Sequence, residues 1–308
     1  MHSQFVVAGI DIGGTKTSAV LCDRAGVVLG SAVVPTPARE GGMAMSNAAA
    51  DLVRQLTVET GLAPVTVGVG AAGVIDQETG TVTAASESFT DWAGFPLADE
   101  LEAALGLRVR VENDVNAFLH GEMSYGALAG SRDALGITLG TGVGGAIAIG
   151  GAIFTGPRGA AGEIGHTPGY SDIVCTCGQV GHLETLASGR SISARYGERT
   201  CTSELVSSEQ VADRARNGDE AALAVFSDAG RALALAIASA VNLIDLQDVV
   251  IGGGVRGAWD LLEPVLMATL DDNQPVSGYS LTVRPSSLGS RAVALGAAAQ
   301  AWQLADTA

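Results

Sequence analysis

Runs of apolar residues divide the chain into short strands that end in glycine-rich turns and into longer helical stretches. The run from Val6 to Ile12 predicts a strand that leads into a glycine pair. Two further strands are expected at Thr17–Asp23 and Ala25–Pro37, with a turn at Arg24–Gly26 between them. Because these strands follow one another so closely, the pattern indicates a β-hairpin unit at the start of the chain.

Helices and buried strands alternate over the next part of the chain. We expect helices at Met43–Glu59, at Leu97–Leu105 and from about Val115, and strands at Thr66–Asp76 and Arg108–Asp114. Gly106 is placed to stop the second helix. Strands that alternate with helices in this way are typical of an α/β fold.

The hairpin pattern then begins again. Ala134–Phe154 predicts strand, glycine turn, strand, short turn and strand. Further elements are expected as helices at Leu183–Tyr196, Ser208–Asn217, Glu220–Leu243, Trp259–Leu270 and from Ala292, and as a strand at Leu246–Val255. The repeat indicates two α/β lobes with a cleft between them, the usual place for a small ligand. We assign residues 1–118 to the first lobe, with a C-terminal helix at about 292–308 packing back on it, and residues 119–291 to the second.

Composition narrows the class of protein. A net charge of −16 and a pI near 4.5 argue against binding to nucleic acid or to an anionic membrane, and otherwise indicate only solubility. The apolar run Ala232–Val241 is about half the length that crosses a bilayer, so we expect a buried helix there. The N-terminus has no basic region before its apolar run, and four cysteines at irregular spacing form no disulfide framework. We therefore expect a cytoplasmic protein.

Three glycine turns follow apolar strands, at Asp11–Thr17, Leu139–Gly145 and Gly252–Gly254. Glycine lets backbone N–H groups approach a phosphate closely. In the first turn Thr15 offers a hydroxyl and Lys16 a charge, and Asp11 is a candidate to hold Mg²⁺ through water. Taken alone, each turn is more often a plain hairpin turn, but three of them, each after an apolar strand and in both lobes, indicate a nucleotide between the lobes.

Soft metal ligands are concentrated in one loop. The chain has four cysteines and four histidines, and two of each are His166, Cys175, Cys177 and His182. Two thiolates and two imidazoles are sufficient for a closed tetrahedral zinc site, which would order a loop rich in Gly, Ser and Pro. The alternative is two free cysteines and two surface histidines. Carboxylates at Glu163 and Glu184 flank the cluster.

Several motifs, in this order, give a resemblance to a known family. They are "DIGGTKT", "VENDVNA", "LGTGVGG", "GAAGEIGH", "CTCGQVGHLE" and "IGGGV". The motifs follow one another in the order found in the ROK family of sugar kinases and sugar-responsive repressors, which the chain resembles over almost its whole length. The resemblance implies an α/β fold of two actin-like ATPase (ribonuclease H-like) lobes around a central cleft. It also implies a homodimer that uses ATP and Mg²⁺, contains structural Zn²⁺, and transfers the γ-phosphate of ATP to the 6-hydroxyl of glucose or a related hexose.

The resemblance also implies roles for individual residues. Asp114 is the catalytic base, for which the alternative role is a helix N-cap. Sugar-binding residues are Gly73, Asn113, Asp114, Glu163, His166 and Glu184; solvated surface charge is the alternative for the two glutamates. Phosphate and nucleotide contacts fall on Asp11, Gly13, Gly14, Thr15, Lys16, Thr141, Gly142, Gly253 and Gly254. His166, Cys175, Cys177 and His182 are the metal ligands, and His166 also contacts the sugar.

The chain departs from the family pattern at a few positions. His182 stands where the family typically has a third cysteine, and Ala72 stands where proline is frequent. The stretch Ser86–Leu97 lacks the asparagine that kinases of the family often have shortly before the tryptophan. Kinases of N-acetylglucosamine, N-acetylmannosamine or amino sugars, and a polyphosphate donor in place of ATP, remain open. So does a non-catalytic sugar-binding regulator. A repressor would need a helix-turn-helix domain before the first strand, which we place at about residue 5.

Overall fold

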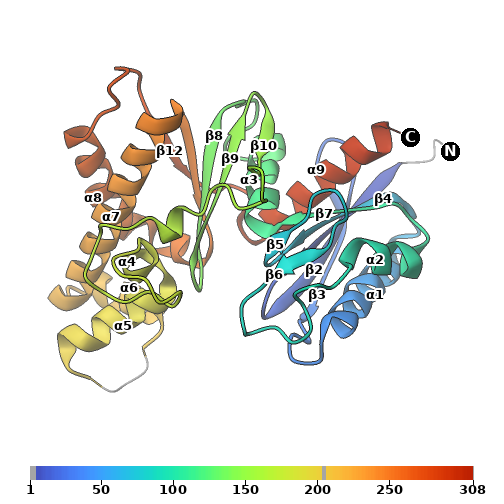
Figure 1. The fold of residues 1–308 in the computed structure, drawn as a ribbon, viewed down its shortest axis with the longest axis horizontal. Coiled ribbons are helices and arrows are strands. Elements are labelled where there is room, and N and C mark those ends of the chain that lie inside the picture. Colours follow the sequence, from blue (N-terminus) through green and yellow to red (C-terminus); the bar gives the residue numbers. More distant parts are fainter. Residues whose placement is uncertain (1–4, 203–205, 308) are drawn as a thin grey trace. The chain divides into compact units, whose positions relative to one another are not determined.

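The computed structural model describes residues 5–202 and 206–307, and it forms two compact units (Figure 1). The first combines the described residues of Met1–Arg132, Gly151–Ala161 and Ser287–Ala308; the second combines Asp133–Gly150 and Gly162–Ser286. Residues 1–4 and 308, which the predicted first lobe includes, lie outside the described residues.

A five-stranded sheet forms the first unit, in the order β3-β2-β1-β4-β7. Its strands are β1 (Val6–Ile12), β2 (Lys16–Cys22), β3 (Val28–Pro35), β4 (Pro64–Ala71) and β7 (Val109–Asn113). The first three are antiparallel hairpins, whereas β4 lies parallel to β1 and β7 parallel to β4. A small second sheet pairs β5 (Val74–Ile75) with β6 (Val82–Ala84). The short strand β10 (Ala152–Phe154) lies in the segment Gly151–Ala161, which belongs to this unit.

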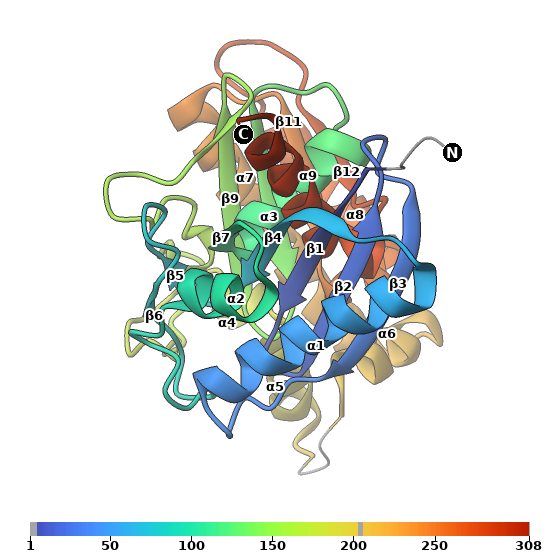
Figure 2. The ribbon, with the colours of Figure 1, turned by 90° about the vertical axis from the view of Figure 1, so that its right-hand side faces the viewer.

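Helices cover both faces of this sheet, because successive side chains of a strand point to opposite faces. Ile10 joins the core under α1 (Gly42–Thr60) and α2 (Leu97–Leu105), and Figure 2 shows α1 crossing the strands on that side. Val7 faces the other way, into the core built by α9 (Ala292–Asp306). Helix α3 (Asp114–Tyr125) packs along α9. Strands β1, β4 and β7 are parallel, and α3 follows β7 directly. Their carboxyl ends therefore lie at one edge of the sheet, together with the start of α3.

Glycines allow α9 to lie directly on the sheet and on α3. A Cβ atom built on Gly9 would stand 1.9 Å from the carbonyl oxygen of Ala294, and one on Gly68 would stand 1.8 Å from that of Ala297. A Cβ on Gly296 of α9 itself would stand 1.7 Å from the carbonyl oxygen of Ala117. Because all three obstacles are backbone atoms, no side-chain rotation can relieve them.

Gly296→Ala is therefore expected to destabilise the protein by about 1–3 kcal/mol or more, by overpacking. Helix propensity alone predicts the opposite sign, since alanine is favoured over glycine in a helix by about 1 kcal/mol. Urea unfolding measures the difference. The matched control is Gly257→Ala, where an added Cβ meets nothing within 4 Å. A Gly296→Ala protein as stable as the control would contradict the close packing of α9.

The second unit repeats the sheet topology of the first. Its strands lie in the order β9-β8-β11-β12, with β8 (Ala134–Leu139), β9 (Val143–Ile149), β11 (Asp248–Gly252) and β12 (Thr282–Pro285). β8 and β9 form an antiparallel hairpin, whereas β11 is parallel to both β8 and β12. This is the arrangement of β2, β1, β4 and β7, so the predicted duplication and the predicted α/β class are confirmed.

Helices on this sheet form the second core. They are η1 (Ile164–His166), α4 (Glu184–Ala187), α5 (Gly189–Thr200), α6 (Ser208–Arg216), α7 (Glu220–Ile244), η2 (Gly254–Ala258) and α8 (Trp259–Asp272). The turn η3 (Gly289–Arg291) leads into α9 of the first unit. By length and composition alone α7 could cross a membrane, but its residues Phe226, Leu233 and Ile237 are buried in this core, and α8 packs alongside it.

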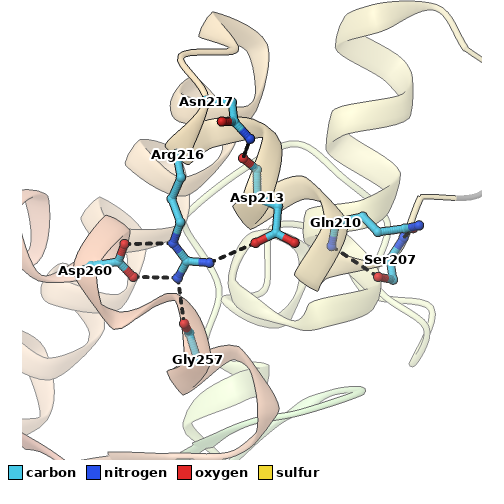
Figure 3. Close-up of polar contacts among 7 residues, drawn as sticks. All are labelled: Ser207, Gln210, Asp213, Arg216, Asn217, Gly257 and Asp260. Atoms are coloured by element: carbon cyan, nitrogen blue, oxygen red, sulfur yellow. Dashed lines mark hydrogen bonds and ion pairs between the residues drawn. The ribbon is translucent and has the colours of Figure 1, made fainter.

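Arg216 joins three of these helices, as Figure 3 shows. Its Nε and one terminal nitrogen donate to the two carboxylate oxygens of Asp260 at 2.9 and 2.7 Å, and the same terminal nitrogen donates to the carbonyl oxygen of Gly257 at 2.8 Å. The other terminal nitrogen contacts Asp213 at 3.2 Å. These hydrogen bonds hold the pKa of the Asp260 carboxyl below its usual range. They fix η2 and the start of α8 against α6.

Some predicted boundaries differ from the structure. The predicted lobe boundary after residue 118 falls inside α3, which packs on α9 along its length, and the compact units change over after Arg132. The helix predicted at Leu183–Tyr196 is interrupted at Ser188, whose hydroxyl accepts a hydrogen bond from the backbone of Ser191 and so caps a new helix. The strand predicted from Ala25 begins at Val28, because the Asp23 carboxylate accepts from two backbone amides of the preceding turn.

Candidate active site and metal centre

The four predicted metal ligands lie together at the end of η1 and in the loop that leads from it to α4. Ligand atoms of His166, Cys175, Cys177 and His182 are all within 4.8 Å of one another. The Nδ1 atoms of His166 and His182 are 3.2 Å apart, Cys177 Sγ is 3.3 Å from His182 Nδ1, and Cys175 Sγ is 3.9 Å from His166 Nδ1. Residues up to 16 positions apart are thus brought to one point.

These distances fit a tetrahedral zinc ion. Bonds of about 2.0 Å to nitrogen and about 2.3 Å to sulfur, at tetrahedral angles, separate two nitrogens by about 3.3 Å and a nitrogen from a sulfur by about 3.5 Å. The observed separations of 3.2, 3.3 and 3.9 Å lie close to these values. Cys175 and His182 are buried, whereas Cys177 is exposed. The donor set and its spacing therefore suit structural zinc.

The carboxylate of Glu184 is held beside this loop. One oxygen accepts a hydrogen bond from the backbone N–H of Val143 at 3.0 Å, and the other accepts from the hydroxyl of Thr176 at 3.1 Å. Thr176 lies between the two cysteines in the sequence, so the metal loop itself positions Glu184. Glu163 is exposed at the N-terminal end of η1, and His166 closes the same short helix.

Two glycine turns of the second unit lie against each other. A Cβ on Gly253, which has φ 85°, would stand 2.4 Å from the carbonyl oxygen of Leu139, so only glycine fits there. The carbonyl oxygen of Gly140 accepts from the backbone of Gly189 at 2.8 Å, at the start of α5. Gly142 faces Glu184, whose carboxylate would stand 2.5 Å from an added Cβ. The predicted contacts Thr141, Gly142, Gly253 and Gly254 are therefore grouped around the end of β8.

In the first unit Asn113 and Asp114 lie where β7 meets α3. The Asn113 side chain is the N-cap of α3: its oxygen accepts from the backbone of Val115 at 2.8 Å and of Asn116 at 3.2 Å. Its amide nitrogen donates to the carbonyl oxygen of Gly73 at 2.9 Å. The alternative role considered for Asp114, the N-cap, thus belongs to its neighbour. Asp114 occupies the first turn, where its carboxylate accepts from the backbone N–H of Val115 at 3.0 Å.

Asp11 is a second carboxyl group close to Asp114. It lies in β1 one residue before the strand end, on the face opposite Ile10 and Ile12, which α9 covers. Burial and, as the smaller cause, the negative charge of Asp114 together raise its pKa from 3.8 to about 7. A carboxyl group with a raised pKa is a candidate to bind a cation, since a cation stabilises its ionised form.

The first glycine turn is also a plain hairpin turn. The backbone N–H of Gly13 donates to the carbonyl oxygen of Lys16 at 3.1 Å, and this closes the turn between β1 and β2. Gly14, Thr15 and Lys16 are exposed at its tip. Neither Gly13 nor Gly14 has a positive φ. Their contribution is therefore the absence of a side chain and not a special backbone conformation.

Sequence reasoning missed two residues that position the predicted site. Trp92 is buried, stacks between Phe89 and Phe95, and donates from its indole nitrogen to the carbonyl oxygen of Ala72 at 2.8 Å. It thereby fixes the turn that contains Gly73. Thr176 was missed as the hydrogen-bond donor to Glu184. A hydroxyl between two metal ligands was the available signal.

The raised pKa of Asp11 predicts a pH-dependent stability. Between about pH 4 and 7 the folded protein keeps a proton that the unfolded chain has released, so this group's contribution to stability falls as pH rises through about 7. Asp11→Asn should leave the free energy of unfolding unchanged near pH 4. Near pH 8 it should raise that free energy by a few kcal/mol at most, since one pKa unit is worth about 1.4 kcal/mol. Denaturant unfolding at both pH values, in chelator and without nucleotide, measures this. Asp99→Asn, at an exposed acid of α2, is the control, and an equal response of the two variants would contradict the assignment.

Comparison with known proteins decides the family. A model of the ROK family matches residues 7–303. The chain belongs to the ROK family. It is 34% identical to the glucokinase of Thermotoga maritima over 304 residues, which cover 94% of this chain and 95% of that protein. It is 35% identical to the N-acetylmannosamine kinase of Shigella flexneri over 254 residues, or 81% of this chain and 83% of that protein.

Solved structures agree with this family. The crystal structure of a ROK family glucokinase from Streptomyces griseus, in complex with glucose and AMPPNP, matches with a TM-score of 0.82 at 31% identity. It covers 97% of this chain and 99% of that one. This ROK protein therefore has the actin-like ATPase fold of the ROK sugar kinases, as the motifs predicted, and it is a sugar kinase.

Proposed function

We propose that this ROK protein is an ATP-dependent hexose kinase that phosphorylates the 6-hydroxyl of glucose or a close relative of glucose. The observation that carries the proposal is full-length similarity to glucokinases in a chain that keeps Asp114 at the start of α3. Phosphoryl transfer needs a positioned nucleophile, an acceptor for its proton and stabilisation of charge on the moving phosphate.

Asp114 is the proton acceptor in this proposal. The sugar's 6-hydroxyl gives its proton to the Asp114 carboxylate as its oxygen attacks the γ-phosphorus of ATP, and the bond to the ADP oxygen breaks. Asn113 caps the helix that carries Asp114 and holds the Gly73 carbonyl, so one side chain orders two sugar-binding segments. Its remaining amide hydrogen can donate to a sugar hydroxyl.

The second unit supplies the carboxylates that bind the sugar. Glu163 and Glu184 accept hydrogen bonds from sugar hydroxyls, a role that suits groups which only accept when ionised. His166 turns Nδ1 toward the other metal ligands, which leaves Nε2 for the sugar. Zinc, when bound by His166, Cys175, Cys177 and His182, orders this loop. The hydrogen bond from the Thr176 hydroxyl to the Glu184 carboxylate then fixes Glu184 relative to the ordered loop.

Charge on the phosphates would be stabilised by a cation and by hydrogen-bond donors. Asp11 would hold Mg²⁺, whose positive charge would offset the negative charge of the triphosphate. The donors in this proposal are backbone and side-chain groups of Gly13, Gly14, Thr15, Lys16, Thr141 and Gly142. In this proposal the adenosine contacts Gly253 and Gly254. Arg216 stabilises the η2 helix that follows Gly253 by its hydrogen bond to the carbonyl oxygen of Gly257.

Substrate choice and setting complete the proposal. Similarity to an N-acetylmannosamine kinase makes N-acetyl hexosamines the second candidate class, and Glu163 before "IGH" favours glucose or N-acetylglucosamine. We place the protein in the cytoplasm, where its four free cysteines stay reduced, and expect a homodimer, which sedimentation analysis tests.

Identification of the product tests the proposed reaction. Purified protein is incubated with glucose, ATP and Mg²⁺, and phosphorus NMR follows the phosphate. Glucose 6-phosphate formed in step with ADP is the expected result. Formation of inorganic phosphate alone, or of a phosphoester at another hydroxyl, would overturn it. Replacement of ATP by polyphosphate in the same assay identifies the donor.

A further inference from the structure

His182 presents one particular ring nitrogen to the metal ligands. Its Nδ1 lies 3.2 Å from His166 Nδ1 and 3.3 Å from Cys177 Sγ, while its Nε2 lies 3.2 Å from the side-chain oxygen of Gln179. The ring is 1% exposed, so water cannot easily replace either contact. Gln179 is thus the residue that contacts the side of the ring facing away from the other ligands.

The chemistry of neutral imidazole makes this contact decisive. Only one ring nitrogen carries a proton, and the other carries the lone pair that binds a metal. An acceptor at Nε2 favours the form with the proton on Nε2, which leaves the lone pair on Nδ1. We propose that Gln179 is a positioning residue of the zinc centre. It accepts the Nε2 proton of His182 and thereby turns Nδ1 toward the metal as a full ligand.

The backbone of the loop holds Gln179 in the place that this role requires. The carbonyl oxygen of Gln179 accepts from the backbone N–H of Cys175 at 2.7 Å, and Gly178 donates to the carbonyl oxygen of Cys175 at 2.8 Å. A β-bridge between Val174 and Val180 closes the same turn. Because the Gln179 backbone is tied to Cys175, the exposed Gln179 side chain starts from a fixed point beside the metal ligands and reaches His182 from there.

The need for this partner follows from the ligand that the chain uses. A cysteine at position 182 would bind zinc through a thiolate that has no tautomers and needs no acceptor behind it. A histidine needs its ring oriented and its proton placed, and partners of this kind change metal affinity by about 10- to 100-fold. Gln179 therefore acts only through His182, which makes the proposal separable from the general stability of the loop.

Zinc affinity of four proteins tests the proposal, with turnover left out of the readout. Competition with a chromophoric chelator gives the zinc dissociation constant. Gln179→Leu should weaken zinc binding by about 10- to 100-fold, and Gln179→Glu, which keeps an acceptor, should not weaken it. Gln55→Leu, at an exposed glutamine of α1 whose amide donates to Glu59, is the matched control and should bind zinc like the unaltered protein.

A double-mutant cycle distinguishes positioning from a structural effect. In a His182→Cys background, Gln179→Leu should leave zinc affinity unchanged, because the ligand that it positions is gone. Cobalt substitution gives a second readout: the visible absorption of a tetrahedral two-sulfur, two-nitrogen site should be altered by Gln179→Leu in the original background alone. An unchanged zinc affinity of Gln179→Leu, or an equal loss in both backgrounds, would overturn the proposal. Neither result depends on whether the protein phosphorylates a sugar.

Discussion

Asp114→Asn is expected to lower kcat by about 10²–10⁴-fold while the dissociation constant for the sugar stays within a few-fold of its original value. The large loss follows because an amide cannot take the proton of the attacking hydroxyl, and general base catalysis contributes about this much to a rate. The fold should survive, since asparagine retains a side-chain oxygen that can accept from the backbone of Val115. Steady-state kinetics and calorimetric titration with glucose provide the two measurements.

The control for this variant is another acid in the first turn of a helix. Asp99 occupies that position in α2 and is exposed, so Asp99→Asn removes the same charge from a comparable site. It should leave kcat unchanged. If Asp114→Asn turned over at a rate near that of the control, Asp114 would not be the base. A loss of sugar binding equal to the loss of kcat would assign Asp114 to binding alone.

Cys175→Ser is expected to remove bound zinc and to lower kcat/KM for the sugar by about 10²-fold. Serine keeps the size of the buried side chain but offers a far weaker ligand. Without the metal the loop loses the order that holds Thr176 against Glu184, and displacement of a binding group by about 1 Å can cost this much. Metal analysis and sugar kinetics on the same preparation test both parts.

Cys201→Ser is the matched control, because Cys201 is exposed and is not one of the four clustered ligands. It should keep zinc and full activity. Zinc absent from the unaltered protein, or a zinc-free Cys175→Ser protein with unchanged sugar kinetics, would separate the metal from the sugar site. That outcome would leave the clustered cysteines and histidines without the role proposed for them.

The periodicity of the sequence predicted elements whose burial is regular. β1 was predicted at its observed residues because every side chain but that of Asp11 is fully buried, and α2 because Gly106 stops it in the left-handed conformation. β12 was not predicted: its four residues are only partly buried or exposed and end in proline, so they give no strand pattern. β6 is three residues long and gives none either.

The candidate site was predictable to the level of residue type but not of contact. The spacing of His166, Cys175, Cys177 and His182 indicated a metal centre, and the structure gathers all four. Which residue caps α3 depends on backbone angles at Asn113 that the sequence does not reveal. The hydrogen bond from the Val143 backbone N–H to the Glu184 carboxylate joins residues 41 positions apart, and no local sequence pattern predicts such a pairing. Contacts of this kind arise only once the sheet and the loop are folded.

Turnover with a panel of sugars tests the central claim most directly. ADP release is measured with ATP and Mg²⁺ against glucose, mannose, amino sugars, N-acetylglucosamine and N-acetylmannosamine, using protein shown to contain zinc. We expect turnover with a hexose of the glucose type well above that with the rest of the panel. Absence of turnover with every sugar would contradict the assignment as a kinase of these hexoses.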